Sequence, residues 1–379
     1  MSAGTLPRAA GGVTGATLGV EEEFHVARAG DLRLHDDPVL NRAALAGRLG
    51  ERVSAEIATT QLETATAVCT TLDEVRAELL AARAQASAAA ASAGAVLLAA
   101  STHPLGCWHE QRLTSRPRYL ELLEKWGLLA LQQVICGCHV HVGVPDLEVA
   151  VAVMDRVRPH LPLLLALTGS SAFHEGSDTG YDSYRTQWFA RWPITGPPEE
   201  MGSAEQYLTV VQALRTAGVV EDSSNLYWDV RPSLKYPTLE FRVADVCTDV
   251  DDAVLHAALV RSLTRVLAGR ARAGWPVPPV RPEVLRAARW RAARFGLGGD
   301  LLDPVTLDLV PAPEAARRLL AELEGDLREH GEHGTVRDLL ESLLARGTSA
   351  TRQRAVLHRT GDLHRVAEWL VRCGTGESR

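Results

Sequence analysis

The chain has 379 residues, enough for one large catalytic domain or two ordinary ones, and 46% hydrophobic with 23% charged residues is typical of a soluble globular protein. Because 47 acidic residues outnumber 40 lysines and arginines, the net charge of -7 argues against nucleic acid or an anionic membrane as the main partner. The longest apolar run, residues 161–167, contains Pro162 and is far too short to span a bilayer. The six cysteines are scattered and the first residues carry no secretion signal, so we expect a reducing, cytoplasmic setting.

After a Gly- and Ala-rich start that we expect to be flexible through residue 16, residues 17–26 predict the first β-strand. Alternation along a strand puts Glu21 and Glu23 on one side and turns Glu22 away. Two neighbouring carboxylates on a sheet are destabilising unless a counter-charge lies between them, so this face is suited to a cation. The alternative is an edge strand whose acids are solvated.

A second strand-like segment, with Val53, Ile57 and Leu62 as apolar positions, carries Glu56 and Glu63. Small or apolar residues surround both carboxylates, and an unpaired charge in such a setting is strongly destabilising. Both are therefore candidate metal ligands. Their odd separation places them on opposite faces of one strand unless a turn or bulge intervenes.

Helical and strand patterns then follow one another, with helices predicted at 73–93 and 147–167 and strands at 95–100 and 132–144. The loop 176–198 is too rich in aromatic residues and arginine to be disordered. Long ordered loops often carry function, so we expect this one to line a site.

The predicted strand 132–144 carries His139 and His141, whose imidazoles point the same way because one residue separates them. Such a strand can place two metal or phosphate contacts, whereas the alternative is a pair of hydrogen-bonded core histidines. Cys136 and Cys138 flank a single glycine, which is not the spacing of a zinc knuckle, so we expect both to pack in the core.

Strands predicted at 227–231 and 238–243 form an antiparallel pair because the connection between them is short. Glu240 and Arg242 lie on one face of the second strand, and Arg231 ends the first. Two readings remain open: a buried Glu–Arg ion pair, or a site in which Glu240 binds a metal and the arginines hold phosphate oxygens by forked hydrogen bonds.

The chain becomes helical from Asp249 onward, with helices predicted at residues 250–271, 282–294, 312–328, 335–346 and 350–372. No internal repeat or long linker is present. The pattern therefore predicts an α+β fold, an antiparallel sheet backed by helices with a helical C-terminal third. We expect a single catalytic domain, with a sheet-rich core at 17–275 and a helical part at 276–379.

The donor types indicate the metal. Carboxylates with histidine and without thiolates suit Mg²⁺, or Mn²⁺, better than structural zinc, and Mg²⁺ in turn suggests nucleotide phosphates. The chain contains no GxxxxGK[ST], no GxGxxG after a strand, no GxSxG and no HExxH. If an enzyme with this sequence binds ATP, it must therefore use metals and arginines on a sheet instead of a glycine loop at a helix end.

Several motifs occur in order along nearly the whole chain: GVEEEF at 19–24, LET at 62–64, CHVHVG at 138–143, the aromatic loop 184–197, DVRP at 229–232 and TLEFRVAD at 238–245, with weaker matches at 287–296 and 352–354. Together they make the chain resemble the glutamate–cysteine ligase type 2 family of carboxylate–amine ligases. The family's usual aliphatic residues are replaced here by Cys136, Cys138 and His25.

The resemblance implies a glutamine-synthetase-like active site, in which the antiparallel sheet forms a half-funnel and its acids hold two or three Mg²⁺ ions around ATP. The metal ligands implied are Glu21, Glu23, Glu56, Glu63, His139 and Glu240. Arg231 and Arg242 would face phosphate and Arg185 the substrate or phosphate, with His141 beside the bound nucleotide.

The implied reaction begins with attack of a substrate carboxylate on the γ-phosphate of ATP, which gives an acyl phosphate and ADP; an amine then displaces phosphate to form an amide. The resemblance implies a glutamate-like acid, a cysteine-like amine and a homodimer, without a nucleic-acid or membrane partner. The residues leave open a guanido-kinase-like phosphotransferase, a non-catalytic nucleotide- or metal-binding protein and, least favoured, a zinc hydrolase built on His139 and His141. No residue identifies either substrate.

Overall fold

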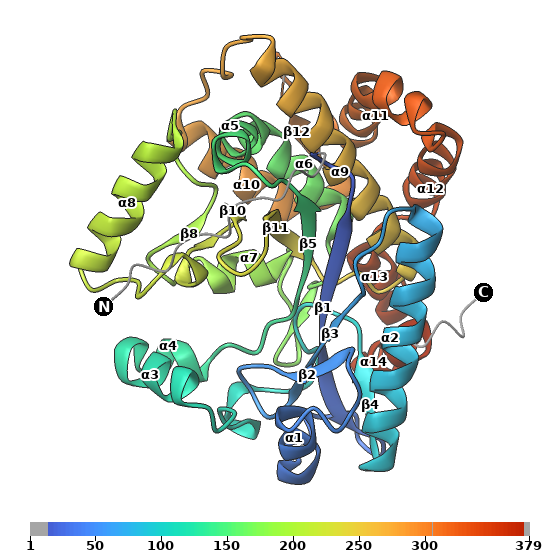
Figure 1. Ribbon diagram of the computed structural model, residues 1–379. Helices are drawn as coiled ribbons and strands as arrows, with labels where there is room; N and C mark the ends of the chain where they lie inside the picture. The colour runs from blue at the N-terminus through green and yellow to red at the C-terminus, as the bar shows by residue number, and fades with distance from the viewer. Residues whose placement is uncertain (1–13, 305, 375–379) are drawn as a thin grey trace.

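The computed structural model describes residues 14–304 and 306–374, so most of the N-terminal segment predicted to be flexible lies outside the described residues. Its centre is a seven-stranded sheet in the order β10-β11-β5-β1-β3-β2, with β4 paired to β1 and every pairing antiparallel (Figure 1). The strands of this sheet are β1 (Leu18–Arg28), β2 (Val53–Ala55), β3 (Gln61–Ala65), β4 (Ala95–Leu98), β5 (Gly137–Gly143), β10 (Val230–Pro232) and β11 (Thr238–Asp245). Small two-stranded pairs are β6 (Phe173–His174) with β7 (Ser177–Asp178), β8 (Thr195–Gly196) with β9 (Tyr227–Trp228), and β12 (Asp300–Leu302) with β13 (Leu309–Pro311).

Helices surround the sheet and fill the C-terminal third of the chain. They are α1 (Pro38–Leu45), α2 (Leu72–Ser92), α3 (Pro117–Trp126), α4 (Leu128–Leu131), α5 (Leu147–Val157), α6 (Leu161–Thr168), α7 (Tyr184–Phe189), α8 (Ala204–Thr216), α9 (Val250–Arg272), α10 (Pro282–Phe295), α11 (Ala312–Glu329), α12 (His333–Arg346), α13 (Ser349–Thr360) and α14 (Leu363–Gly374). In Figure 1, α2 lies along one side of the long strand β1, whereas α3 and α4 extend from the other side. Among the described residues, no helix combines the length and the apolar character needed to cross a bilayer.

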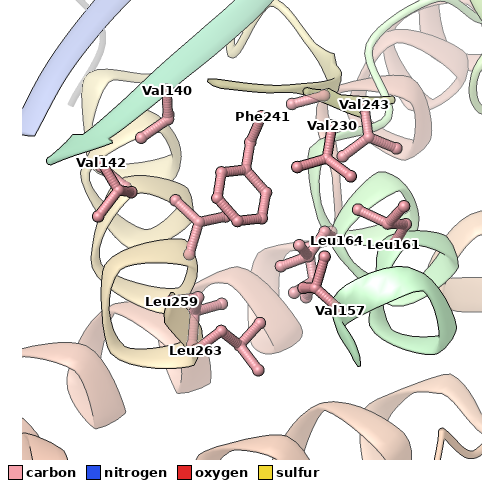
Figure 2. Close-up of a cluster of buried hydrophobic side chains, with 14 of the residues drawn as sticks. Val140, Val142, Val157, Leu161, Leu164, Val230, Phe241, Val243, Leu259 and Leu263 are labelled. Atoms are coloured by element: carbon pink, nitrogen blue, oxygen red, sulfur yellow. The ribbon is translucent and has the colours of Figure 1, made fainter. Parts of the chain in front are cut away.

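One face of the sheet is apolar and packs on helices. Alternate residues of β5 and β11, such as Val140, Val142 and Phe241, join a buried cluster with Leu164 of α6 and Leu259 of α9 (Figure 2). Because side chains alternate between the two faces of a strand, the intervening residues of the same strands point to the opposite face. Helices α2, α6 and α9 therefore pack on the apolar face, and the intervening side chains point away from them.

A buried ion pair lies within the apolar face and joins β1 to α2. Glu22 is fully buried, and the Arg83 guanidinium of α2 donates to its two carboxylate oxygens at 2.8 and 2.5 Å. Arg83 also donates to the backbone carbonyls of Cys247 and Thr248, at 2.6 and 2.8 Å. Glu22 thus points away from Glu21 and Glu23, as alternation predicts, and a helix supplies its counter-charge.

The α+β prediction is confirmed, but three predicted elements are divided differently. The strand-like segment around Val53 and Leu62 is a pair of antiparallel strands, β2 and β3, joined by a turn. The predicted helix 147–167 ends at Val157 and resumes as α6, because Pro159 and Pro162 have no N–H to continue the helical hydrogen bonds.

The third divided element is the last predicted helix, 350–372. It is broken into α13 and α14 at Gly361, which adopts a left-handed φ of 68° and ends α13. The sequence interpretation assigned no elements to residues 101–131, where α3 and α4 form, or to α8. The strand core of segment 132–144 is shorter than predicted, since β5 spans Gly137–Gly143.

Candidate active site

The register of the sheet aligns the predicted site residues on one face. Glu21 lies opposite His139, Glu23 opposite Glu63, and Glu240 lies between His141 on β5 and Arg231 on β10. Residues that face each other across antiparallel strands point to the same side of the sheet. The face not covered by α2 and α9 therefore carries a continuous row of carboxylates, imidazoles and guanidinium groups.

This face forms one wall of a cavity of about 670 Å³. All ten predicted site residues line the cavity: Glu21, Glu23, Glu56, Glu63, His139, His141, Arg185, Arg231, Glu240 and Arg242. The structure thus brings the predicted set together around one cavity.

Glu21 lies between the two histidines of β5. Its carboxylate oxygens are 3.5 Å from Nδ1 of His139 and 3.6 Å from Nε2 of His141. Burial alone would raise the pKa of Glu21, but the close contacts and charges of the two imidazoles outweigh it and hold this pKa far below its usual value. His141 is kept in place from its other side by Thr238, whose hydroxyl is 2.9 Å from Nδ1. Glu21 is therefore an ionised carboxylate in a defined position.

Glu63 and Glu56 lie in the most acidic part of the wall. Burial, followed by the charges of Glu21, Glu56 and Glu23, raises the pKa of Glu63 well above its usual value. Burial and the charge of Glu23 raise the pKa of Glu56 to about 7. The turn between β2 and β3 explains how both residues reach the cavity despite their odd separation.

At the other end of the wall, Glu240 is held by two arginines. Arg231 donates from Nε and Nη2 to the two carboxylate oxygens at 2.9 and 3.1 Å, and Arg242 donates to one of them as well. Burial would raise the pKa of Glu240, but the charges of Arg231 and Arg242 prevail and keep it well below the usual value. The structure therefore contains the Glu–Arg ion pair that was one of the two alternatives for this segment. Arg231, Glu240 and Arg242 nevertheless all line the cavity.

The two arginines differ in what they have left to offer a ligand. The remaining Nη1 of Arg231 donates to the carbonyls of Ser224 and Leu226, at 2.6 and 2.7 Å. Arg242 reaches from Glu240 toward Nδ1 of His139 at 3.4 Å, and its buried Nε has no hydrogen-bond partner. Arg242 therefore keeps unused hydrogen-bonding capacity, whereas the hydrogen bonds of Arg231 go to Glu240 and to backbone carbonyls.

Arg185 lies in the first turn of α7, within the aromatic loop, and is buried. Its two terminal nitrogens donate to the backbone carbonyls of Val243 and Arg242, at 3.4 and 3.2 Å, where the pairing of β11 with β5 shifts register. Its Nη1 also lies 3.8 Å from Asp245. Arg185 thus links the aromatic loop to the C-terminal end of β11.

The cavity is also lined by residues that the sequence interpretation missed. Arg116, Arg118 and Tyr119 come from the start of α3, and Lys235 and Tyr236 from the turn between β10 and β11. Pro117 at the first turn of α3 is a helix-start signal that could have located this element. Nothing in a helix or turn pattern, however, indicates which distant sheet face its side chains will meet.

The donor set fits a divalent cation. Glu21, His141 and Glu240 each offer one ligand atom, and these atoms all lie within 4.8 Å of one another. Beside them, the pKa values of Glu56 and Glu63 are raised by burial and by mutual repulsion, which a cation would relieve. Oxygen donors with imidazole and without thiolate are those of Mg²⁺ or Mn²⁺ sites. The cluster includes His141, which the resemblance placed beside the nucleotide and not among the metal ligands.

The fold and the site define an ATP-dependent ligase that joins a carboxylate to an amine. The model of the glutamate–cysteine ligase family 2 matches residues 17–368, and the chain belongs to this family. A relative from Mycolicibacterium vanbaalenii, which carries the provisional name glutamate–cysteine ligase 2-2, is 44% identical over 92% of this chain and 95% of its own length. A provisionally named glutamate–cysteine ligase 2 from Rhodopirellula baltica is 37% identical over 94% of this chain and 96% of its own length. The predictions of family and ligase activity are confirmed.

Solved structures show the same fold at low sequence identity. A glutamate–cysteine ligase from Francisella tularensis, in complex with AMP, has a TM-score of 0.69 at 13% identity over 96% of this chain and 89% of its own. A bifunctional glutathione synthetase from Pasteurella multocida has the same TM-score at 15% identity over 95% of this chain, which spans about half (52%) of that protein. These similarities confirm the fold prediction.

Proposed function

We propose that the cavity binds ATP with Mg²⁺, forms an acyl phosphate on a small carboxylic acid and passes the acyl group to an amine. The observation that carries this proposal is the division of one sheet face into two ends. Carboxylates of β1 and β3 crowd together at one end, and arginines of β10 and β11 gather at the other. A metal–nucleotide complex carries charges of both signs and complements both ends.

In this proposal Glu21, Glu23, Glu56, Glu63, His139 and Glu240 hold the metal, and His141 adds a further ligand or orients Glu21. When bound, Mg²⁺ would neutralise charge on the phosphate oxygens and align them for in-line transfer. Arg242 would hold the transferring phosphate, and Arg231 would keep Glu240 ionised and oriented. Arg185, with its fixed backbone contacts, would shape the part of the wall that meets the substrate.

For the substrates we propose a glutamate-like acid and a cysteine-like amine, in keeping with the names of the relatives. A homodimeric assembly and a cytoplasmic location remain predictions. A matrix of acids and amines, scored for ADP and phosphate release with products identified by mass, tests the substrate assignment. A stable phosphorylated product without an amide would contradict it and favour a phosphotransferase.

Glu63→Gln tests the metal wall itself. The substitution keeps the shape of the side chain and its contact with Ser54 but removes the charge at the most acidic point. We expect ADP release that depends on the carboxylic acid substrate to fall by about 100-fold or more. The reason is that the metal held by Glu63 would neutralise charge on the transferred phosphoryl group, which is the main catalytic effect in such reactions. The measurement is steady-state ADP release together with Mn²⁺ affinity from electron paramagnetic resonance.

Glu51→Gln is the matched control, since Glu51 is an exposed acid just before β2 and lies outside the cavity lining. Circular dichroism of both variants checks that the fold is kept. Wild-type turnover and Mn²⁺ affinity in Glu63→Gln would remove Glu63 from the metal set.

A further inference from the structure

Lysine is almost absent from this chain. Of its 40 lysine and arginine residues only two are lysines, Lys125 and Lys235. Arginine therefore supplies nearly every surface cation and ion pair, and one of the two exceptions lies at the candidate active site. The two side chains are not equivalent, because an ammonium group is a compact, rotatable charge on a flexible stem and a guanidinium group is a rigid planar fork.

Lys235 lies in the turn that joins β10 to β11, directly after the strand that carries Arg231 and before the one that carries Glu240. Its Nζ is 4.8 Å from the ring centre of Tyr236, and this ring meets the ring of His141 edge-on at 6.2 Å. Lys235 and Tyr236 both line the cavity although their side chains are largely exposed. The turn thus places an exposed cation at the cavity that the carboxylates of the sheet also line.

The charge of Lys235 is not neutralised by a neighbour. Within the described part of the chain no carboxylate lies within 4 Å of its ammonium group. The neighbouring Tyr236 side chain and, more weakly, the charges of Glu21 and Glu63 raise the pKa of Lys235. The ammonium group therefore lies in the field of the same carboxylates that are proposed to hold the metal, and it is free to meet an anion there.

We propose that Lys235 binds the γ-phosphate of ATP and follows this group as it passes to the substrate carboxylate; the inference rests on the proposed metal–nucleotide site. In the transfer the bond between the γ-phosphorus and the bridging oxygen breaks, its electron pair leaves with ADP, and a bond forms from phosphorus to a carboxylate oxygen. Lys235 keeps its proton throughout and contributes charge and hydrogen bonds to the phosphate oxygens.

A lysine suits this task because the phosphate moves. The arginines of the site are held in place by hydrogen bonds to Glu240 and to backbone carbonyls, so the positions of their charges are fixed. A single ammonium group on a four-carbon stem can stay with the phosphoryl group over the distance it travels.

The scarcity of lysine makes a direct chemical test possible. In a Lys125→Arg variant Lys235 carries the only side-chain amine, and its acetylation by N-hydroxysuccinimidyl acetate can be followed by mass spectrometry of its peptide. We expect Mg²⁺ with a non-hydrolysable ATP analogue to slow this acetylation about tenfold, and Mg²⁺ with ADP to slow it less than twofold. The α-amino group is the internal reference.

Nucleotide binding is measured in parallel by calorimetry, so that the two proposals can fail separately. If the analogue binds but leaves the acetylation rate unchanged, or protects no better than ADP, the role of Lys235 is wrong and the nucleotide site stands. Protection by glutamate alone would assign Lys235 to the acid substrate and overturn the inference. If no nucleotide binds, both proposals fail.

Variants give the second readout. We expect Lys235→Met to lower kcat/KM for MgATP by about 100-fold, in the range seen when a single transition-state charge donor is removed, and Lys235→Arg to recover part of this loss. Lys125→Arg is the matched control, since Lys125 on α3 lies outside the cavity lining and packs over Trp126. A Lys235→Met enzyme within twofold of the wild type would overturn the inference.

Discussion

Glu63 is partly buried and Glu240 is buried on the same sheet face, yet their surroundings move the pKa values of the two carboxyl groups in opposite directions. Burial and three neighbouring carboxylates raise the pKa of Glu63, whereas Arg231 and Arg242 overcome burial and lower that of Glu240. The protein itself therefore neutralises Glu240 but leaves Glu63 without a counter-charge. A cation bound beside Glu63 would therefore relieve more repulsion between carboxylates than one bound beside Glu240 alone.

His256 of α9 is a buried histidine away from the site that contributes to the pH dependence of the stability of the fold. Both ring nitrogens are buried without a hydrogen-bond partner, and burial lowers the pKa of His256 to about 4. Between this value and about 6.5 the unfolded chain binds a proton that the folded chain does not, so stability falls as the pH falls. From pH 7 to pH 5 this residue alone should cost about 2 kcal/mol.

We therefore expect His256→Leu to lose less unfolding free energy than the wild type between pH 7 and pH 5, whatever its stability at pH 7. Urea unfolding at both pH values measures the difference, and replacement of the exposed His358 is the control. Equal pH dependence in the wild type and His256→Leu would show that the imidazole is not held neutral by burial.

At the scale of elements, the start of β5 is where sheet and aromatic loop meet most tightly. A Cβ on Gly137 would lie 2.5 Å from Nη2 of Arg185 and 3.1 Å from Nε2 of His139. The same residue donates its N–H to Glu23 at 2.7 Å. Glycine at this position lets two site residues and the backbone approach one another closely.

Gly137→Ala should therefore displace Arg185 from its backbone carbonyls and lower kcat by about tenfold or more, with a stability cost of about 1–3 kcal/mol. Steady-state kinetics and urea unfolding measure the two effects. Gly19→Ala on β1 is the matched control, because its Cβ would approach nothing closer than 3.8 Å. Unchanged kcat in Gly137→Ala would mean that Arg185 is not needed in its observed position.

Alternation along single strands was enough to predict which residues share a face. Glu21 with Glu23 and His139 with His141 follow from the period of two, which depends only on local geometry. Their pairing across strands could not be predicted, because register depends on contacts between segments far apart in the chain. Glu56 needed a turn that the apolar pattern did not reveal.

Side chains from helices and turns were harder to predict than those from strands. Arg118 and Lys235 reach the cavity from α3 and from a turn, where no periodic pattern points to a distant partner. The charge pattern at Arg231 allowed either an ion pair or a phosphate contact, and only the geometry shows the hydrogen bonds to Glu240. Alternation along the strands thus predicted the site residues on the sheet. The residues that come from α3 and the turn, and the hydrogen bonds between site residues, could be identified only from the tertiary structure.

At the scale of the whole molecule, the site is assembled from segments spread between β1 and β11, so a bound ligand links most of the chain. A ligand that binds only the folded state stabilises it by about 2.7 kcal/mol at 100 times its Kd. We expect Mg²⁺ with a non-hydrolysable ATP analogue to raise the Tm in scanning fluorimetry, and the analogue with EDTA to raise it much less. In Glu63→Gln, most of the Mg²⁺-dependent increase in Tm should be lost. If the analogue raised the Tm of the wild type equally with EDTA and with Mg²⁺, nucleotide binding would not depend on a metal ion.

The Glu22–Arg83 pair has a consequence for how the central strand finds its place. If β1 slipped by one residue against its neighbours, Glu22 would enter the cavity, and Glu21 and Glu23 would enter the apolar core. Arg83 would then lose its partner, and carboxylates without counter-charges would be buried, each a large penalty. The Glu22–Arg83 pair on the apolar side of β1 thus disfavours a one-residue register shift during assembly, because the shift would leave Arg83 unpaired and bury two carboxylates.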